Sequence, residues 1–338
     1  MRQVFITRHG GPEVLQLREA PNPSPRANEI ALRVQASGIN FADIMARKGL
    51  YPDAPKPACV VGYEVAGVIE AVGAEVKNFS PGQEVLAMTR FGGYSDFVCV
   101  PAFQVFPKPS NLSMTQAAAV LVTYVTAYQL MIVMGSLRAG ETVLIHNAGS
   151  GVGLAELDLA KKIGARTIGT ASASKHAFLR ERGFDHVIDY RKDDWLPAVL
   201  DLTQGRGVEL VLDPIGGAHW KQSYRALRAT GRLGLSGVST ASTTGSNSKL
   251  GLLKMVLRMP WFTPVGLMNS NKGVFGVNLG HLWEEEEKAL GWIRAVLQGV
   301  TEGWVRPHVD RTFTFAQTGE AHAYIEARQN LGKVVLTP

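Results

Sequence analysis

The stretch TVLIHNAGSGVG, residues 142–153, decides the fold. Its apolar start, 142–145, predicts a strand, and the apolar spacing of 154–163 predicts a helix after the glycine turn. Strand, glycine turn and helix together present backbone N–H groups and the positive end of a helix dipole to a phosphate. A second predicted strand, 166–170, follows, as a βαβ dinucleotide unit requires. The sequence therefore predicts a dinucleotide-binding domain.

The residues after the second strand favour a cofactor with an extra phosphate. An acid at this place would bind an unphosphorylated ribose, but the segment 170–175, TASASK, has none. A lysine supplies a point charge and a tyrosine a hydrogen bond to an adenosine 2′-phosphate, so we predict NADPH as the cofactor. The predicted cofactor-binding residues in this region are Gly149, Gly151, Val152, Gly153, Ser172, Ser174, Lys175 and Tyr190.

Composition limits the class of protein. The chain has 338 residues, 46% of them hydrophobic and 19% charged, which is typical of a globular protein. The net charge is +6, but Lys and Arg are scattered in ones and twos, so we expect no nucleic-acid partner. Cys59 and Cys99 form neither a CxxC pair nor a zinc pattern, and the N-terminal MRQVFITRHGG lacks the apolar core of a signal peptide. These features predict a reduced, cytoplasmic setting.

The segment 109–137 holds no charged residue, and its centre, AAAVLVTYVTAYQLMIVM, is nearly long enough to cross a bilayer. It also carries polar residues in the middle, and Tyr124 and Tyr128 lie one helical turn apart. We therefore predict buried helices at a domain hinge in preference to a membrane span.

The chain divides into a β-rich part and an alternating part. Strands are predicted at 3–6, 14–19, 29–37, 64–72, 84–88 and 94–101, with a short helix at 40–48. From about residue 120, strands and helices alternate, which predicts a doubly wound parallel sheet. A predicted helix covers 281–300, with four glutamates in its first turns. The tail, 305–338, reads as strand, short helix and strand, and we expect it to rejoin the N-terminal β domain.

Several segments together resemble the medium-chain dehydrogenase/reductase family: ASGINFADIMARKGLYP (36–52), VVGYEVAGVIEAVG (60–73), the glycine turn, LDPIGG (212–217) and LGKVVLTP (331–338). Within it, the chain resembles the zinc-free quinone oxidoreductase branch of ζ-crystallin and, more closely, the vesicle amine transport protein group. The resemblance implies a GroES-like β-barrel domain, residues 1–122 and 281–338. It also implies an inserted Rossmann domain, residues 123–280, with an insertion at 239–268.

Zinc enzymes of this family have a Gly-His-Glu segment where this chain has Gly62-Tyr63-Glu64, and a cysteine ligand near the position of Gly38 to Asn40. Neither ligand is present here, so we expect no metal, since a catalytic zinc needs three protein ligands. His146 is interpreted as a packing histidine, or one that supports other site residues, in preference to a metal ligand, and Asp213 is interpreted as structural. The resemblance then implies hydride transfer from NADPH to quinones or α,β-unsaturated carbonyl compounds, whose electron-poor carbon needs no Lewis acid.

Zinc-free relatives imply that Asn40 and Tyr51 lie beside the nicotinamide, with Tyr51 donating a hydrogen bond to the substrate oxygen and acting with Asn40 in catalysis. Tyr63, in the place of the zinc ligand, is predicted to line the substrate pocket. Further cofactor residues implied by the resemblance are Asn40, Thr126, Val238, Phe275, Gly276, Val277, Asn330 and Lys333.

Two other functions stay open. The segment 249–262 has apolar residues at helical spacing beside basic ones, and it is either a lid over an apolar substrate or a peripheral membrane contact. A lid that contacts an acyl chain would suit an enoyl-thioester reductase, and a membrane contact would suit a lipid-handling protein. Relatives imply a homodimer formed near 272–280.

Overall fold

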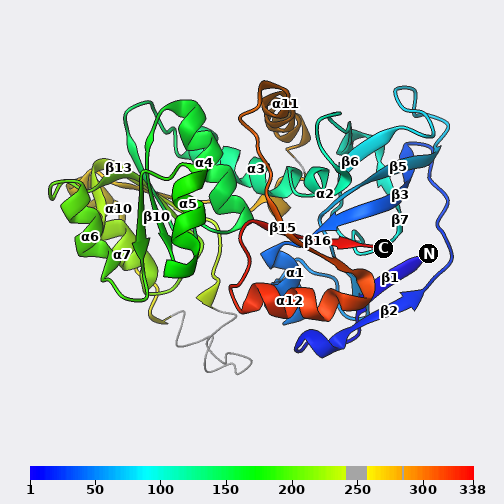
Figure 1. Ribbon diagram of the computed structural model, residues 1–338, viewed down its shortest axis with the longest axis horizontal. Coiled ribbons are helices and arrows are strands. Elements are labelled where there is room, and N and C mark those ends of the chain that lie inside the picture. Colours follow the sequence, from blue (N-terminus) through cyan, green and yellow to red (C-terminus); the bar gives the residue numbers. More distant parts are fainter. Residues whose placement is uncertain (241–256, 284) are drawn as a thin grey trace. The chain divides into compact units, whose positions relative to one another are not determined.

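The computed structural model describes residues 1–240, 257–283 and 285–338, and the chain forms two compact units (Figure 1). Unit 1 comprises Met1–Thr123, Ala295–Glu302 and Pro307–Pro338; unit 2 comprises Tyr124–Arg294 and Gly303–Arg306. The division expected from the family, at 122/123 and 280/281, stays a prediction about the folding domains.

Unit 1 is built on two sheets. The larger has the order β15-β16-β3-β5-β6-β8, with β7 also paired to β3, and the smaller has the order β2-β1-β4. The last strand, β16, pairs antiparallel with β3 through Val335 and Gly38, so the predicted return of the tail to the N-terminal β domain is confirmed. The strands are β1 (Arg2–Ile6), β2 (Leu15–Glu19), β3 (Glu29–Gly38), β4 (Cys59–Val60), β5 (Glu64–Val72), β6 (Glu84–Met88), β7 (Phe97–Pro101), β8 (Val105–Pro107), β15 (Val309–Thr314) and β16 (Lys333–Thr337).

The strands of unit 1 form a core because apolar residues alternate along them. On β3 the buried Ile30, Leu32 and Val34 pack against Val65 and Val85 of neighbouring strands. Short helices close the unit: α1 (Phe41–Arg47), α2 (Met114–Ala117) and α12 (Thr318–Glu326), with 3₁₀ turns η1 (Pro12–Val14), η2 (Ala102–Gln104) and η6 (Phe315–Gln317).

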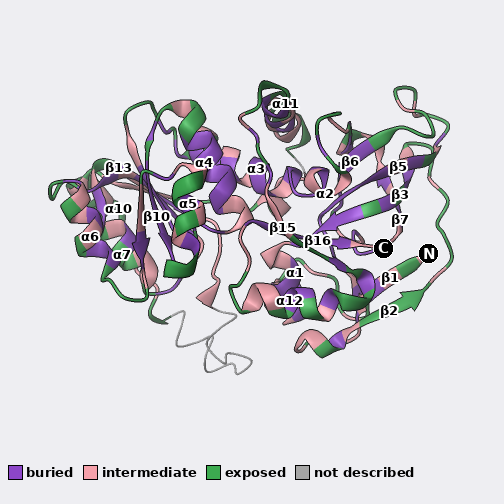
Figure 2. Cartoon of the chain, viewed as in Figure 1, coloured by how far each residue is buried: buried purple, intermediate pink, exposed green. Residues whose placement is uncertain are grey.

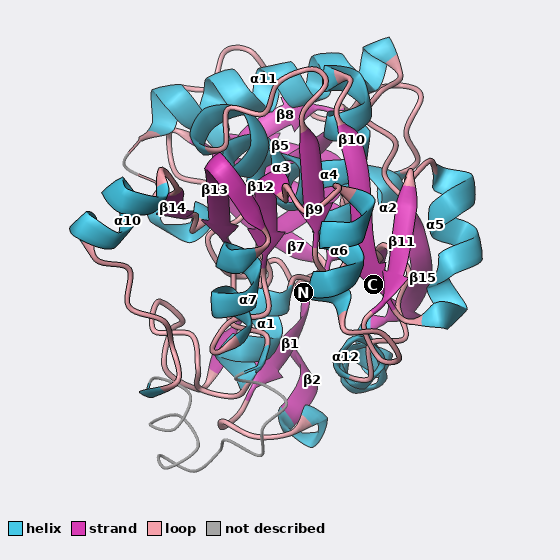
Figure 3. Cartoon of the chain, turned by 90° about the vertical axis from the view of Figure 1, so that its left-hand side faces the viewer, coloured by secondary structure: helices cyan, strands magenta, loops and turns pink. Residues whose placement is uncertain are grey.

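Unit 2 contains a six-stranded sheet in the order β11-β10-β9-β12-β13-β14, in which every pairing is parallel (Figure 3). Helices α4 and α5 lie on one face of this sheet and α6 and α7 on the other (Figure 1). This confirms the predicted doubly wound fold. Its strands are β9 (Thr142–Ile145), β10 (Arg166–Ala171), β11 (His186–Asp189), β12 (Val208–Asp213), β13 (Leu227–Leu235) and β14 (Gly273–Gly276). Its helices are α4 (Gly151–Ile163), α5 (His176–Arg182), α6 (Trp195–Leu202), α7 (His219–Arg225) and α10 (Pro264–Ser270), with η4 (Ala173–Lys175) and η5 (Leu279–His281).

The apolar segment around residue 120 folds as α3 (Leu121–Tyr128) followed by a π-helical stretch, η3 (Gln129–Met134). By length and composition alone, Met114–Met134 is apolar enough to cross a membrane, but 67% of its most apolar window is buried inside the protein. Figure 2 shows the same burial along α3. The burial agrees with the prediction that these are core helices.

The helix before the C-terminal tail differs from the prediction. The helix predicted at 281–300 begins later, as α11 (Glu286–Glu302), because Asn278 caps the 3₁₀ turn η5 by accepting from the Gly280 N–H at 3.0 Å. That prediction of the start was wrong, and only Glu286 and Glu287 lie in its first turn. Residues 249–256 of the helix predicted at 249–262 lie outside the described residues.

Candidate functional site

The glycine turn of unit 2 is shaped by its backbone. α4 begins after Ser150, whose Oγ accepts from the Gly153 N–H at 3.0 Å. A Cβ on Gly153 would lie 2.7 Å from the Asn147 carbonyl oxygen and 2.8 Å from that of Ala148, so only glycine fits. The N–H groups of Gly151 and Val152 precede the first intrahelical hydrogen bond, which Leu154 donates to Ser150. The turn therefore has the backbone geometry that the predicted phosphate cradle requires, and its role in binding stays a prediction.

The residues predicted to bind the 2′-phosphate follow neighbouring strands. Ala171 of β10 is in register with Asp189 of β11, so the segments after these strands leave the sheet at the same edge. The Ser172 and Ser174 hydroxyls are 3.3 Å apart, and Lys175 is 9% exposed on η4. Tyr190 follows β11, with the Arg191 guanidinium carbon 5.9 Å from its ring centre. Hydroxyls and cations thus gather at one edge of the sheet.

In unit 1, Asn40, Glu64 and Lys333 form a buried group that we call the Lys333 cluster. Lys333 Nζ lies 2.6 Å from both Glu64 Oε1 and Asn40 Oδ1, and Asn40 Nδ2 donates to Glu64 Oε1 at 3.2 Å. The Lys333 and Glu64 side chains are only 5% and 1% exposed. The second carboxylate oxygen of Glu64 accepts from the Val122 N–H at 3.1 Å. The carboxylate is therefore neutralised by its own chain.

Asp43 joins this cluster to the segment that replaces the zinc ligand. Its Oδ2 accepts from the Asn40 N–H at 2.7 Å and its Oδ1 from the Gly62 N–H at 2.9 Å. Burial raises the pKa of Asp43 to about 7, although these two N–H groups and the charge of Lys333 act to lower it. The carboxyl group thus fixes the Asn40 and Gly62 backbones while titrating near neutral pH.

Tyr51 and Tyr63 lie together in unit 1, as the prediction of a shared substrate pocket requires. Their rings meet edge to face with centroids 6.2 Å apart, and Phe91 packs against Tyr63 at 5.5 Å. Burial, and secondarily the Asp43 charge, raise the pKa of Tyr63 well above the ordinary range. Its hydroxyl therefore stays protonated at neutral pH.

The remaining predicted residues are divided between the two units. In unit 2, Thr126 is half-buried on α3, Val238 follows β13, Phe275 and Gly276 lie in β14, and the Val277 N–H donates to Leu235 at 2.8 Å. In unit 1, Asn330 Nδ2 donates to the Gly332 carbonyl at 2.9 Å. Their roles stay predictions.

A group of polar side chains in unit 2 was not predicted as a group. His146 and Asp213 meet His219, and Ser223 Oγ donates to Asp213 Oδ2 at 2.6 Å. Burial lowers the pKa of His146 to about 3. Burial alone would raise the pKa of Asp213, but hydrogen bonds from His219 and Ser223 lower it to about 2. The available sequence signal was the i,i+4 spacing of His219 and Ser223, which places both on one face of a helix.

Comparison with known proteins agrees with this fold. Residues 26–110 match the family described as alcohol dehydrogenase GroES-like domain, and residues 182–336 match that described as zinc-binding dehydrogenase. The human synaptic vesicle membrane protein VAT-1 homolog is 35% identical over 341 residues, covering 100% of this chain and 86% of the relative. The chain belongs to the medium-chain dehydrogenase/reductase family.

Within this oxidoreductase family, a quinone oxidoreductase of Pseudomonas aeruginosa is 33% identical, covering 100% of this chain and 99% of the relative. The crystal structure of Escherichia coli quinone oxidoreductase complexed with NADPH superposes with a TM-score of 0.88 at 28% identity, covering 100% of both chains. The expected resemblance to quinone oxidoreductases and to vesicle amine transport proteins is confirmed. So is the fold of a GroES-like domain with a Rossmann-type parallel sheet.

Proposed function

We propose that this chain is an NADPH-dependent reductase of quinones or α,β-unsaturated carbonyl compounds that works without a catalytic zinc. The observation that carries the proposal is the Lys333 cluster. At the place where zinc enzymes of the family hold a cysteine ligand, Asn40 is bound to Lys333, and Lys333 neutralises Glu64 at 2.6 Å. Tyr63 stands in place of the histidine ligand. An ammonium, an amide and a phenol are not the thiolate and imidazole ligands that zinc takes, so these side chains support a reaction without a catalytic metal.

The residues of unit 2 fit NADPH. The space above Gly153, the Ser150 cap and the free backbone N–H groups at the start of α4 form an anion cradle. Lys175 and Tyr190 supply the charge and the hydrogen bond that a 2′-phosphate requires, and NADPH is the cofactor in the Escherichia coli relative's structure. When bound, NADPH supplies the hydride. The residues of unit 2 proposed to hold it are Thr126, Gly149, Gly151, Val152, Gly153, Ser172, Ser174, Lys175, Tyr190, Val238, Phe275, Gly276 and Val277. Those of unit 1, proposed from the family resemblance, are Asn40, Asn330 and Lys333.

The chain's own side chains have to orient the substrate and supply a proton. Tyr51 donates a hydrogen bond to the substrate oxygen, which withdraws electrons from the conjugated system and favours hydride addition. The Tyr63 hydroxyl stays protonated because of its raised pKa, and its ring, with Phe91, offers an apolar wall for a planar substrate. As negative charge develops on the substrate oxygen, the Tyr51 proton moves to it and water restores the tyrosine.

The experiment is to follow NADPH absorbance while the purified protein is offered quinones, conjugated enals and enones, and crotonyl-CoA. We expect turnover with the quinones or the enones, and Tyr51→Phe should lower kcat by about 100-fold, the lower limit usual for general acid catalysis. Turnover of crotonyl-CoA well above all the others would favour an enoyl-thioester reductase instead. The absence of NADPH oxidation with every substrate would contradict the proposal.

A second candidate function is contact with a membrane surface, and one observation favours it. Near the end of the insertion, Trp261 is 92% exposed, Leu257 74% and Met268 73%, beside the exposed Arg258. The same region borders β14, the edge strand where the proposed homodimer would form. Sedimentation with anionic liposomes, compared between wild type and Trp261→Ser, distinguishes a membrane contact from a dimer surface. A membrane contact predicts binding that the substitution weakens, whereas a dimer surface predicts no binding and a fall in oligomer size.

A further inference from the structure

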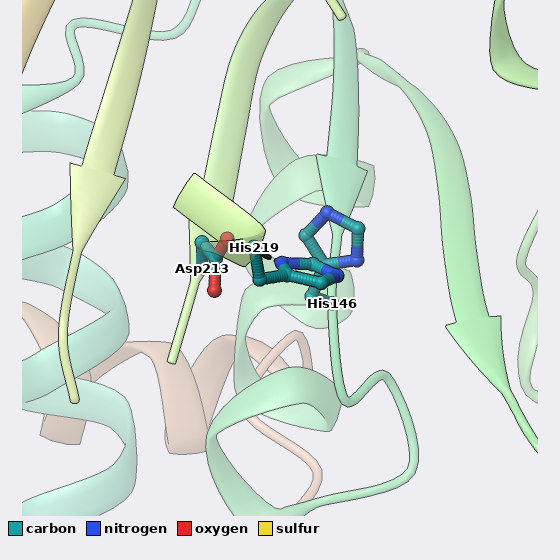
Figure 4. Close-up of side chains that lie close together, drawn as sticks. All are labelled: His146, Asp213 and His219. Atoms are coloured by element: carbon teal, nitrogen blue, oxygen red, sulfur yellow. Dashed lines mark hydrogen bonds and ion pairs between the residues drawn. The ribbon is translucent and has the colours of Figure 1, made fainter. Parts of the chain in front are cut away.

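Three side chains with metal-binding atoms meet at the carboxyl edge of the sheet in unit 2 (Figure 4). Leu212 of β12 is in register with Ile145 of β9, so the next residues, Asp213 at the end of β12 and His146 just after β9, lie side by side. The chain then turns back through Gly216, with φ +92°, and α7 begins at His219. The fold, rather than a local motif, brings the three together.

The ligand atoms converge on one point. One atom from each of His146, Asp213 and His219 lies within 4.8 Å of the others, and His219 Nδ1 is 2.7 Å from Asp213 Oδ2. The Ser223 hydroxyl identifies the facing atoms, since its Oγ is 3.3 Å from His146 Nε2, 3.4 Å from His219 Nδ1 and 2.6 Å from Asp213 Oδ2. Two imidazoles, a carboxylate and a hydroxyl therefore surround the same space.

The outer contacts are those that hold metal ligands in place. His146 Nδ1 pairs with Thr170 Oγ1 at 2.9 Å, which orients the ring, and Asp213 Oδ1 accepts from the Ile215 N–H at 2.7 Å. The Trp195 ring lies 4.6 Å from that of His146 and 5.1 Å from that of His219, which closes one side with an apolar wall. Asp213 is fully buried, whereas 18% of the His219 side chain is exposed, so the group lies just below the surface.

We propose that His146, Asp213 and His219 bind a divalent transition-metal ion, with Zn²⁺ the best fit. Two nitrogen donors and one carboxylate are a donor set that zinc uses with three protein ligands, whereas Mg²⁺ and Ca²⁺ prefer oxygen alone. On binding, each imidazole keeps one proton: that of His219 moves to Nε2 and that of His146 to Nδ1, where Thr170 Oγ1 accepts it. The ion replaces the hydrogen bond between His219 and Asp213. Water or the Ser223 hydroxyl takes the fourth position.

The test is a titration of metal-free protein with Co²⁺, read by visible absorption, followed by displacement with Zn²⁺. We expect one tetrahedral Co²⁺ per chain. X-ray absorption of the zinc form should show nitrogen and oxygen neighbours at about 2.0–2.2 Å and no sulfur at about 2.3 Å. His219→Ala should weaken binding by at least about 100-fold and Thr170→Val by about 10-fold. His186→Ala, on β11 and outside the group, is the control and should bind as wild type does.

His219 is partly exposed at the start of a helix, so its removal should leave the fold intact, which circular dichroism checks. Equal Co²⁺ affinity in wild type and His219→Ala, an octahedral spectrum, or a sulfur neighbour would overturn the proposal. Metal binding is read without substrate or NADPH. A failure of metal binding would therefore say nothing about the proposed reductase activity, and a failure of reductase activity would say nothing about metal binding.

Discussion

The glycine turn of unit 2 and the Lys333 cluster of unit 1 are built in opposite ways. The turn comes from one continuous stretch, and its shape depends on backbone atoms and on the absence of a Cβ at Gly153. The cluster joins residues 293 positions apart, Asn40 and Lys333, and depends on opposite charges taken out of water. An added atom should therefore damage the turn, whereas removal of one charged partner should damage the cluster.

The largest expected effect is on the cluster. Lys333→Met leaves the Glu64 carboxylate buried without its counter-charge, which should cost about 3–5 kcal/mol of unfolding free energy. Urea unfolding followed by tryptophan fluorescence measures it. The double variant Glu64→Gln/Lys333→Met removes both charges and should recover most of that loss. A single-variant loss under about 1 kcal/mol would mean that the pair is not buried in solution.

The next effect is a pH dependence from Asp43. Its pKa is raised from 3.8 to about 7 in the folded chain, so the folded state holds this proton more tightly than the unfolded state does. The stability from this group is complete below pH 4 and declines as the pH rises to 7, by at most about 4 kcal/mol. The unfolding free energy of wild type relative to Asp43→Asn should therefore rise as the pH falls from 7 to 4. A difference that does not change with pH would contradict the raised pKa.

In the turn, Gly153→Ala should act through sterics. The new Cβ would press on two carbonyl oxygens within 2.8 Å, which should cost about 1–3 kcal/mol of stability and weaken NADPH binding. Fluorescence titration with NADPH reads the second effect. Gly291→Ala is the matched control, because a Cβ there meets no atom within 4 Å in α11, and it should be neutral or slightly stabilising. Unchanged NADPH affinity in Gly153→Ala would show that the glycine turn does not take part in cofactor binding.

The smallest effect should come from the cap of α4. Ser150→Ala loses the hydrogen bond to the Gly153 N–H, which should cost about 1 kcal/mol of unfolding free energy. Thermal unfolding measures it. Ser150→Asp keeps an acceptor at the cap and should restore most of the stability. Equal melting temperatures of the wild type and the alanine variant would show that the cap contributes nothing.

This contrast explains what could be predicted from the sequence. The glycine turn, α4 and the strands beside it follow from periodicity and turn chemistry within about 30 residues, and the structure has them where predicted. The start of α11 was predicted too early. The side chain of Asn278 accepts a hydrogen bond from the Gly280 N–H and stabilises a separate 3₁₀ turn, and helical periodicity does not reveal this local competition.

Side-chain partnerships across long stretches of chain could not be predicted. Family resemblance singled out Asn40, Tyr63 and Lys333 one by one, but not the pairing of Lys333 with Glu64, 269 positions away. Likewise, nothing near His219, at the start of α7, indicates in the sequence that its ring meets that of His146, which follows β9. Such pairings depend on sheet order and register, which arise from the packing of the whole unit.

Specificity for NADPH, on which the proposed reductase depends, is measured by kcat/KM for NADPH and NADH in wild type and Lys175→Ala, with a quinone as acceptor. We predict that wild type prefers NADPH. The substitution should lower kcat/KM for NADPH by about 10- to 150-fold, equivalent to about 1.5–3 kcal/mol for one charged hydrogen bond, and leave NADH unchanged. Lys161→Ala, in the last turn of α4, should change neither. Equal losses with both cofactors, or a wild type that uses NADH as well as NADPH, would contradict the account.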